Sequence, residues 1–230
     1  MKRSASVFLT ANPVPKKKKK SIKKSLTPGF KRNTNGVPAK LRTTLKYAET
    51  ITINPSAGGC GGNTFRCNSL HDPNYTGVGH QPMGFDQLKL LYARYLVTSA
   101  RIKVTQVPAS VSTTIPGMFG VILNDDYSLG SGKSLQSILE QRNISKTEVT
   151  GTVTSLTTPI KYSCNLSQYF GIKDISSDSE LSARGTVDPD RQCYFTVFYG
   201  QDSSIAGQKD FMVEIEYDCL FTEPIELAQS

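Results

Sequence analysis

Apolar and polar residues alternate with a period of two along much of this chain after residue 40. The clearest case is near the C-terminal end, where every second residue is apolar or aromatic and three of the residues between are acidic. The apolar set is Phe211, Val213, Ile215, Tyr217, Cys219 and Phe221, and the acidic set is Glu214, Glu216 and Asp218. Such alternation predicts a long strand with one face packed and the other in water.

Residues 80–105 contain both common periodicities. The large apolar residues between Phe85 and Tyr95 are spaced by three and four, which predicts a short helix. From Leu96 the period changes to two, which predicts a half-buried strand. The predicted packed side carries Leu96, Thr98, Ala100, Ile102 and Val104, and the solvent side carries Ser99, Arg101, Lys103 and Thr105.

Similar patterns predict most of the remaining elements. Strands are expected near 43–53, at 64–69, at 118–124, within 146–158 at a sheet edge, at 160–164 and at 193–199. A second short helix is expected at 134–141, a compact turn at 165–175 and a polar loop at 175–191. Seven or eight strands with two short helices predict an all-β, antiparallel sandwich or barrel.

The charge of the chain is strongly segregated. Residues 1–46 contain fourteen Lys or Arg and no acidic residue, whereas the rest contains thirteen basic and nineteen acidic residues. We therefore expect a basic arm of +14 on a mildly acidic body of −6. Residues 1–37 are expected to form this arm, disordered because like charges repel and nothing apolar can be buried. The basic residues within 1–37 are Lys2, Arg3, Lys16, Lys17, Lys18, Lys19, Lys20, Lys23, Lys24, Lys31 and Arg32, and the other three of the fourteen follow at 40, 42 and 46.

Two roles fit such an arm, and they are compatible. Lysines that contact phosphates release condensed counterions, which favours nucleic-acid binding without sequence preference. The same lysine clusters are typical of a nuclear localisation signal read by an import receptor. Phe8 and Phe30 are the arm's only aromatic residues, so base stacking can contribute little beside charge.

Several classes of protein are disfavoured. No apolar run is long enough to span a membrane, and the apolar segment at residues 7–9 is too short for a secretory signal, which indicates a reducing compartment. The one conceivable metal quartet is Cys60, Cys67, His71 and His80, whose spacings match no usual zinc module. Three further cysteines, Cys164, Cys193 and Cys219, lie in predicted strands and are interpreted as small apolar residues; no metal or cofactor is predicted.

No enzyme is predicted either. Residues 130–134, GSGKS, follow a strand and precede a helix, as in a phosphate-binding loop, but Tyr127 stands where the first glycine of that motif belongs. A plain glycine-rich turn is the preferred interpretation. With two histidines in the whole chain, a nucleophile with a histidine base is disfavoured. The acid pairs Asp188 with Asp190 and Glu214 with Glu216 are expected to face solvent, so no catalytic residue is assigned.

Three segments resemble one family of viral proteins. Residues 65–104, with the loop DPNYTGVGHQP followed by YARYLV, closely resemble the capsid proteins of circovirus-like viruses, which have circular single-stranded DNA genomes and encode a replication protein (CRESS-DNA viruses). NLSQYFGIKD (165–174) and the segment at 215–224 are also similar to that family, in the same order. The arm departs from the family's best-known members in using lysine where they use mostly arginine.

The resemblance implies a single eight-stranded jelly roll, here expected over residues 38–230. Such a subunit would self-assemble into an icosahedral shell of about sixty copies (T=1) and package single-stranded DNA through its arm. It would be found in the virion and, during assembly, in the host nucleus, with a host import receptor and a host attachment receptor as partners. Surface or inter-subunit contacts are expected in the loops at 54–63, 70–82, 124–133 and 175–191.

Two other functions remain open at this point. A nucleic-acid-binding protein that never builds a shell would also need only a β domain and a basic tail. A nucleotide hydrolase using residues 130–134 is the less favoured alternative.

Overall fold

The computed structural model describes residues 36–107, 116–127, 132–150, 157–201 and 207–226. The chain divides into two units, Met1–Arg32 and Asn33–Ser230, and every described residue belongs to the second. The strands are β1 (Lys40–Ile53), β2 (Cys60–Arg66), β3 (Tyr92–Val107), β4 (Met118–Asn124), β5 (Glu148–Val149), β6 (Ile160–Asn165), β7 (Ser182–Arg184), β8 (Tyr194–Gly200) and β9 (Lys209–Pro224). The helices are α1 (Phe85–Lys89), α2 (Leu135–Leu139), α3 (Leu166–Phe170) and the 3-10 turn η1 (Ile175–Ser177).

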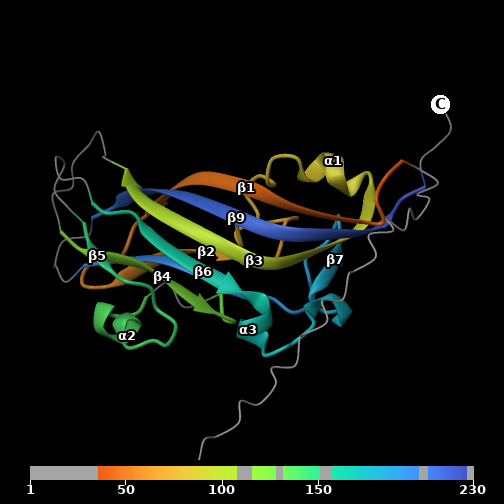
Figure 1. The fold of residues 1–230 in the computed structure, drawn as a ribbon. Helices are drawn as coiled ribbons and strands as arrows, with labels where there is room; N and C mark the ends of the chain where they lie inside the picture. The colour runs from red at the N-terminus through yellow and green to blue at the C-terminus, as the bar shows by residue number, and fades with distance from the viewer. Residues whose placement is uncertain (1–35, 108–115, 128–131, 151–156, 202–206, 227–230) are drawn as a thin grey trace, which may run out of the picture. The chain divides into compact units, whose positions relative to one another are not determined.

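These strands form two facing antiparallel sheets (Figure 1). The first has the order β1-β9-β3-β6, with β7 also paired to β3, and the second has the order β2-β8-β4-β5. Leaving aside β7, this is the strand order of an eight-stranded jelly roll, in which most successive strands cross from one sheet to the other. The predicted all-β jelly roll is therefore confirmed, with one short extra strand inside the segment predicted to be loop.

The core lies between the sheets and follows the period-two pattern. On β9, all six residues predicted to be packed are buried, and the acidic residues between them are only partly covered. Phe211 of β9 packs against Phe119 of β4 in the opposite sheet, with ring centroids 5.0 Å apart. Alternation was a reliable guide here because each sheet has one face against the other sheet.

The boundary between α1 and β3 differs from the prediction. The helix ends at Lys89, and β3 begins at Tyr92, opposite Pro224 of β9. Pairing with the long partner strand extends β3 backwards into residues whose spacing also suits a helix. Tertiary pairing here overrides a local helical pattern that is only a few residues long.

A β-bulge in β3 changes which side of the strand faces the core. The pairing register shifts between Val97 and Ser99, so Thr98 is the extra residue. Tyr95 and Val97 pack in the core before it, and Ala100, Ile102 and Val104 after it. The prediction is therefore confirmed for Leu96, Ala100, Ile102 and Val104, which are buried, and wrong for Thr98, which is only partly buried.

Two segments predicted as loop or turn are more regular than expected. The glycine-rich stretch at 54–63 contributes residues 60–63 to β2, and a Cβ on Gly61 would lie 2.8 Å from the side chain of Ile53. The predicted turn at 165–175 contains α3. Asn165 caps its start by accepting the Gln168 N–H, and Gly171, with φ +68°, is the C-cap after its last residue.

Helix α2 and the edge strand β5 agree with their predictions. Figure 1 shows α2 outside the second sheet, where Ile138 packs against Ile122 and Phe198. No helix in the described part of the chain is long and apolar enough to cross a membrane.

Candidate functional site

The eleven basic residues predicted to bind nucleic acid, Lys2 to Arg32, lie outside the described residues. Their role and the boundary of the arm at residue 37 therefore stay predictions. The first basic residues that the structure places are Lys40, Arg42 and Lys46.

Lys40, Arg42 and Lys46 belong to the folded body, which corrects the size of the arm's charge. All three are on β1, exposed on the face of the first sheet that points away from the core. The arm thus carries +11 instead of +14, and the body −3 instead of −6. Charge counting along the sequence missed this because a strand with one wet face accommodates lysine at alternate positions as readily as a tail does.

The same face of the first sheet carries a row of ion pairs. Arg101 donates to Asp218 with Nη1 to Oδ2 at 2.6 Å, Lys46 Nζ lies 2.8 Å from Glu216 Oε1, and Lys103 pairs with Glu214. Glu214 and Glu216 therefore face solvent, as predicted, but each has a cationic neighbour on an adjacent strand. The bonds from Arg101, together with hydroxyls of Thr44 and Ser99, hold the pKa of Asp218 well below its usual range.

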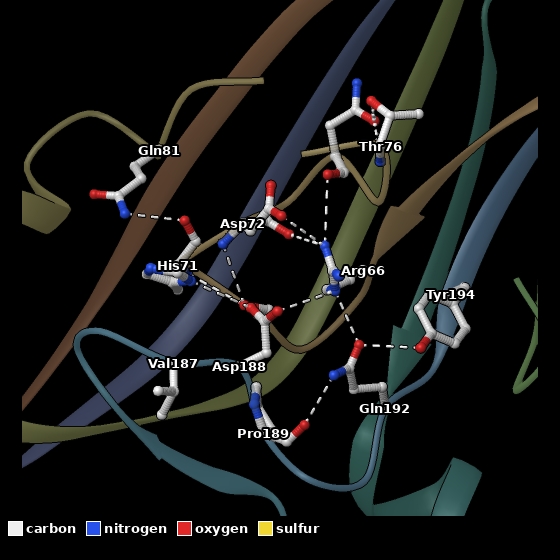
Figure 2. Close-up of polar contacts among 12 residues, drawn as sticks. Arg66, His71, Asp72, Thr76, Gln81, Val187, Asp188, Pro189, Gln192 and Tyr194 are labelled. Atoms are coloured by element: carbon white, nitrogen blue, oxygen red, sulfur yellow. Dashed lines mark hydrogen bonds and ion pairs between the residues drawn. The ribbon is translucent and has the colours of Figure 1, made fainter. Parts of the chain in front are cut away.

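A second cluster of polar contacts surrounds Arg66 at the end of β2 (Figure 2). Its guanidinium is only 10% exposed and lies between two carboxylates, with Nη1 3.1 Å from Asp72 and Nε 3.4 Å from Asp188. Arg66 also donates to the Asp72 carbonyl at 2.7 Å and to the side chain of Gln192 at 2.9 Å. The guanidinium lies over the ring of Tyr75 at 4.8 Å. This one side chain therefore joins β2, the 70–82 loop and the segment before β8.

Asp188 was predicted to face solvent, and the structure corrects this. Its side chain is 22% exposed, accepts a hydrogen bond from Ser69 Oγ at 2.5 Å and lies 3.7 Å from His71 Nδ1. Asp188 is distant in sequence from all of these partners. The local alternation of apolar and polar residues therefore cannot predict these contacts. A Ser-Leu-His-Asp run beside a strand that ends in arginine is the only sequence signal that could have pointed to a charged cluster.

The Arg66 cluster holds the 70–82 loop against the body. The backbone N–H of Arg66 bonds to Pro73 O at 2.7 Å, and Gln81 donates to the carbonyl of His71. Asn74 is buried and donates to Glu49 at 2.9 Å, which in turn accepts a bond from Tyr47. The loop's backbone is thus fixed, while Val78 and Met83 project from the segment with exposed fractions of 80% and 88%.

The glycine-rich stretch at 130–134 is described only from Gly132 onwards. There Gly132 and Lys133 make backbone bonds to Cys60, and Ser134 is the N-cap of α2, accepting the Ser137 N–H at 3.2 Å. The hydroxyl that would ligate a nucleotide's magnesium ion therefore has a structural role in this arrangement, which favours the turn interpretation.

The conceivable quartet Cys60, Cys67, His71 and His80 is not brought together. Cys60 packs outside the second sheet with Phe198, and the ring of His80 stacks on Tyr47. Instead, the sulfur atoms of Cys67, Cys164 and Cys193 all lie within 4.8 Å of one another, a grouping that sequence spacing did not reveal. Burial raises the pKa of the Cys67 thiol, and the neighbouring S–H groups lower that of Cys164.

No protein-family model and no curated protein matches this sequence. Among solved structures, that of Cocksfoot mottle virus is similar over 96% of this chain and 98% of that chain, with 13% identity and a TM-score of 0.50. The 60-mer BFDV capsid protein matches over 83% and 97%, with 12% identity and a TM-score of 0.46. The decameric BFDV capsid protein matches over 80% and 99%, with 11% identity and a TM-score of 0.43.

The solved structures similar to this chain are thus those of a virus and of viral capsid proteins. At such low identity the likeness is one of fold. The two-sheet jelly roll described above is the fold that this chain and the Cocksfoot mottle virus structure have in common.

Proposed function

We propose that this chain is the structural subunit of a small icosahedral virus capsid. The jelly-roll body builds the shell, and the basic arm condenses single-stranded DNA on the inside. The observation that carries the proposal is the combination of a capsid-type jelly roll with a separate arm in which eleven cations occur without one acidic residue.

The surface of the body supports assembly. Val78, Met83 and Leu90, between β2 and β3, are 80%, 88% and 69% exposed, and large exposed apolar side chains favour a protein partner. The 70–82 loop is fixed by the Arg66 cluster, so a contact made through it costs little ordering of the chain. We propose a second copy of this chain as that partner, within a closed shell of about sixty copies.

The arm's charge suits a small genome. Sixty arms of eleven charges would bring about 660 cations inside the shell, against one negative charge per nucleotide. This is enough to neutralise a large part of a genome on the order of a thousand nucleotides, with polyamines or metal ions covering the rest. Lysine serves this purpose as well as arginine because neutralisation needs no bidentate geometry.

The basic arm and the jelly-roll body are also proposed to act at different stages of infection. Before assembly, the lysine clusters would be read by a host import receptor and would take the chain to the nucleus. In the virion, the arm would be occupied by DNA, and exposed loops would contact a host attachment receptor.

The test is electron microscopy and sedimentation of the purified full-length chain beside a variant that lacks residues 1–36. We expect particles roughly 20 nm across from both, with nucleic acid in the full-length particles only. A small discrete species under every condition of salt and nucleic acid would contradict the capsid proposal and favour a nucleic-acid-binding protein that does not assemble. Particles of the variant that still contain nucleic acid would contradict the role of the arm alone.

A further inference from the structure

Three cysteines from distant parts of the chain meet in the core of the sandwich. Cys67 follows β2, Cys164 is on β6 and Cys193 precedes β8. Their exposed fractions are 0%, 2% and 0%, and their sulfur atoms all lie within 4.8 Å of one another. Of the groups of potential metal ligands among the described residues, this is the one that brings three together.

Hydrogen bonds to the backbone or strand pairing position each of these residues. The N–H of Cys67 bonds to the carbonyl of Cys193 at 2.8 Å, and the N–H of Cys193 bonds to the side chain of Asn68 at 3.3 Å. Cys164 lies in the opposite sheet, paired with Ala100 of β3. The three thiols therefore bridge the two sheets from positions that regular backbone bonding fixes.

Convergence of three sulfur atoms suits a particular class of ligand. In a trigonal or tetrahedral site with metal–sulfur bonds of about 2.3 Å, the sulfur atoms stand about 3.8–4.0 Å apart. The observed upper limit of 4.8 Å requires only a small rotation of the side chains to reach that spacing. Thiolate ligands select soft ions such as copper(I) and zinc over hard ions such as magnesium and calcium.

We propose that Cys67, Cys164 and Cys193 bind one thiophilic d¹⁰ metal ion, zinc(II) or copper(I), which cross-links the two sheets. Three sulfur–metal bonds form, the S–H bonds they replace release their protons to solvent, and no electron is transferred. The cation offsets thiolate charge that an apolar core would otherwise disfavour. Because the site is enclosed, the ion is acquired as the chain folds, and its binding energy adds to the stability of the sandwich.

Two other buried cysteines provide matched controls. Cys60 packs with Ile122 and Phe198 outside the second sheet, and Cys219 donates its S–H to the carbonyl of Thr43 at 3.1 Å. Both are as enclosed as the three clustered cysteines, with exposed fractions of 1% and 3%, but neither has a sulfur partner in the grouping. Replacing either one therefore tests for the general cost of losing a buried thiol.

The experiment measures retained metal. The full-length chain is unfolded and refolded without oxygen in the presence of Zn²⁺ alone or of Cu(I) alone, passed through a chelating column and assayed by mass spectrometry. We expect about one ion per chain for at least one of the two metals in the wild type, Cys60→Ala and Cys219→Ala. In Cys164→Ala and Cys67→Ala we expect at least a tenfold loss. The refolding condition in which the protein retains metal, Zn²⁺ or Cu(I), identifies the ion.

X-ray absorption of the loaded wild type keeps the proposal testable if a core variant fails to fold. Three sulfur neighbours at about 2.3 Å support the site. Retention of neither metal overturns the proposal, as does equal retention by Cys164→Ala or a first shell made of nitrogen and oxygen. None of these outcomes depends on particle assembly, so this experiment tests the metal site independently of the proposed capsid function.

Discussion

Arg66 joins three segments of the chain that are far apart in sequence. Its partners Asp72, Asp188 and Gln192 come from the loop after β2 and from the segment before β8. A guanidinium suits this position because its donors point in several fixed directions, whereas an ammonium group is a point charge. The cluster positions the 70–82 loop, where we propose contacts between subunits.

Loss of the Arg66 side chain is expected to be costly. In Arg66→Ala, Asp72 and Asp188 would remain partly buried and close together without their cation, so we expect a loss of about 3 kcal/mol in the free energy of unfolding. Urea unfolding followed by tyrosine fluorescence measures it, since the chain has ten tyrosines and no tryptophan. Lys103→Ala, which breaks a more exposed pair with Glu214, is the control and should cost less than about 1 kcal/mol. Equal losses in the two variants would show that the Arg66 cluster contributes no more to stability than an exposed ion pair.

The pair between Arg101 and Asp218 predicts a pH dependence. The pKa of Asp218 is lowered in the folded state, so its contribution to stability is present above its unfolded value of about 4 and is lost as the pH falls through the lower folded value. We therefore expect Asp218→Asn to be less stable than the wild type at neutral pH, with the difference closing below about pH 4. Unfolding curves between pH 7 and pH 2 measure this, with Glu226→Gln as a control for the loss of one carboxyl. A difference that does not shrink between pH 4 and pH 2 would mean that the carboxylate charge is not its cause.

At the scale of elements, short segments depend strongly on what they pack against. α1 and β3 share a stretch whose apolar spacing suits a helix, and pairing with β9 decides where the strand begins. α2 is only five residues long and depends on its cap and on Ile138, which is fully buried against the second sheet. The turn chemistry around α2 therefore matters more than its helix propensity.

The cap of α2 distinguishes a structural turn from a phosphate-binding loop. Ser134→Ala removes the acceptor of the Ser137 N–H and should lower the free energy of unfolding by about 1 kcal/mol, whereas Ser134→Asp should restore most of it. Lys133→Ala should change neither stability nor the binding of nucleoside triphosphates, as measured by calorimetry. Nucleotide binding that Lys133→Ala abolishes would instead revive the nucleotide-hydrolase alternative.

At the scale of the whole molecule, the proposed function is divided between two units of different composition. The body buries a continuous core between two sheets, whereas the first thirty-two residues contain all eleven cations of the arm and no acidic residue. The body itself is slightly acidic, so the proposed attraction to nucleic acid would depend on the arm.

The salt dependence of DNA binding tests this division. Replacing the five lysines at 16–20 with Gln should reduce the slope of log K against log salt concentration by about 3.5, because each contact with single-stranded DNA contributes about 0.7. Replacing Lys40, Arg42 and Lys46 with Gln is the matched control, since these cations are on β1 and should change the slope little. Filter binding of a single-stranded oligonucleotide over a range of salt concentrations measures both. Similar slope changes per replaced charge would place β1 in the DNA interface.

The sequence by itself determined the all-β class, most strand positions, the packed face of β9 and the segregation of charge. These depend on neighbours within a few residues, and burial of one sheet face imposes its period directly on the chain. Only the tertiary structure decided the bulge at Thr98, the partners of Arg66 and the meeting of the three thiols. Each of these arises where strands distant in sequence are placed side by side, and a local pattern carries no information about which strand becomes the neighbour.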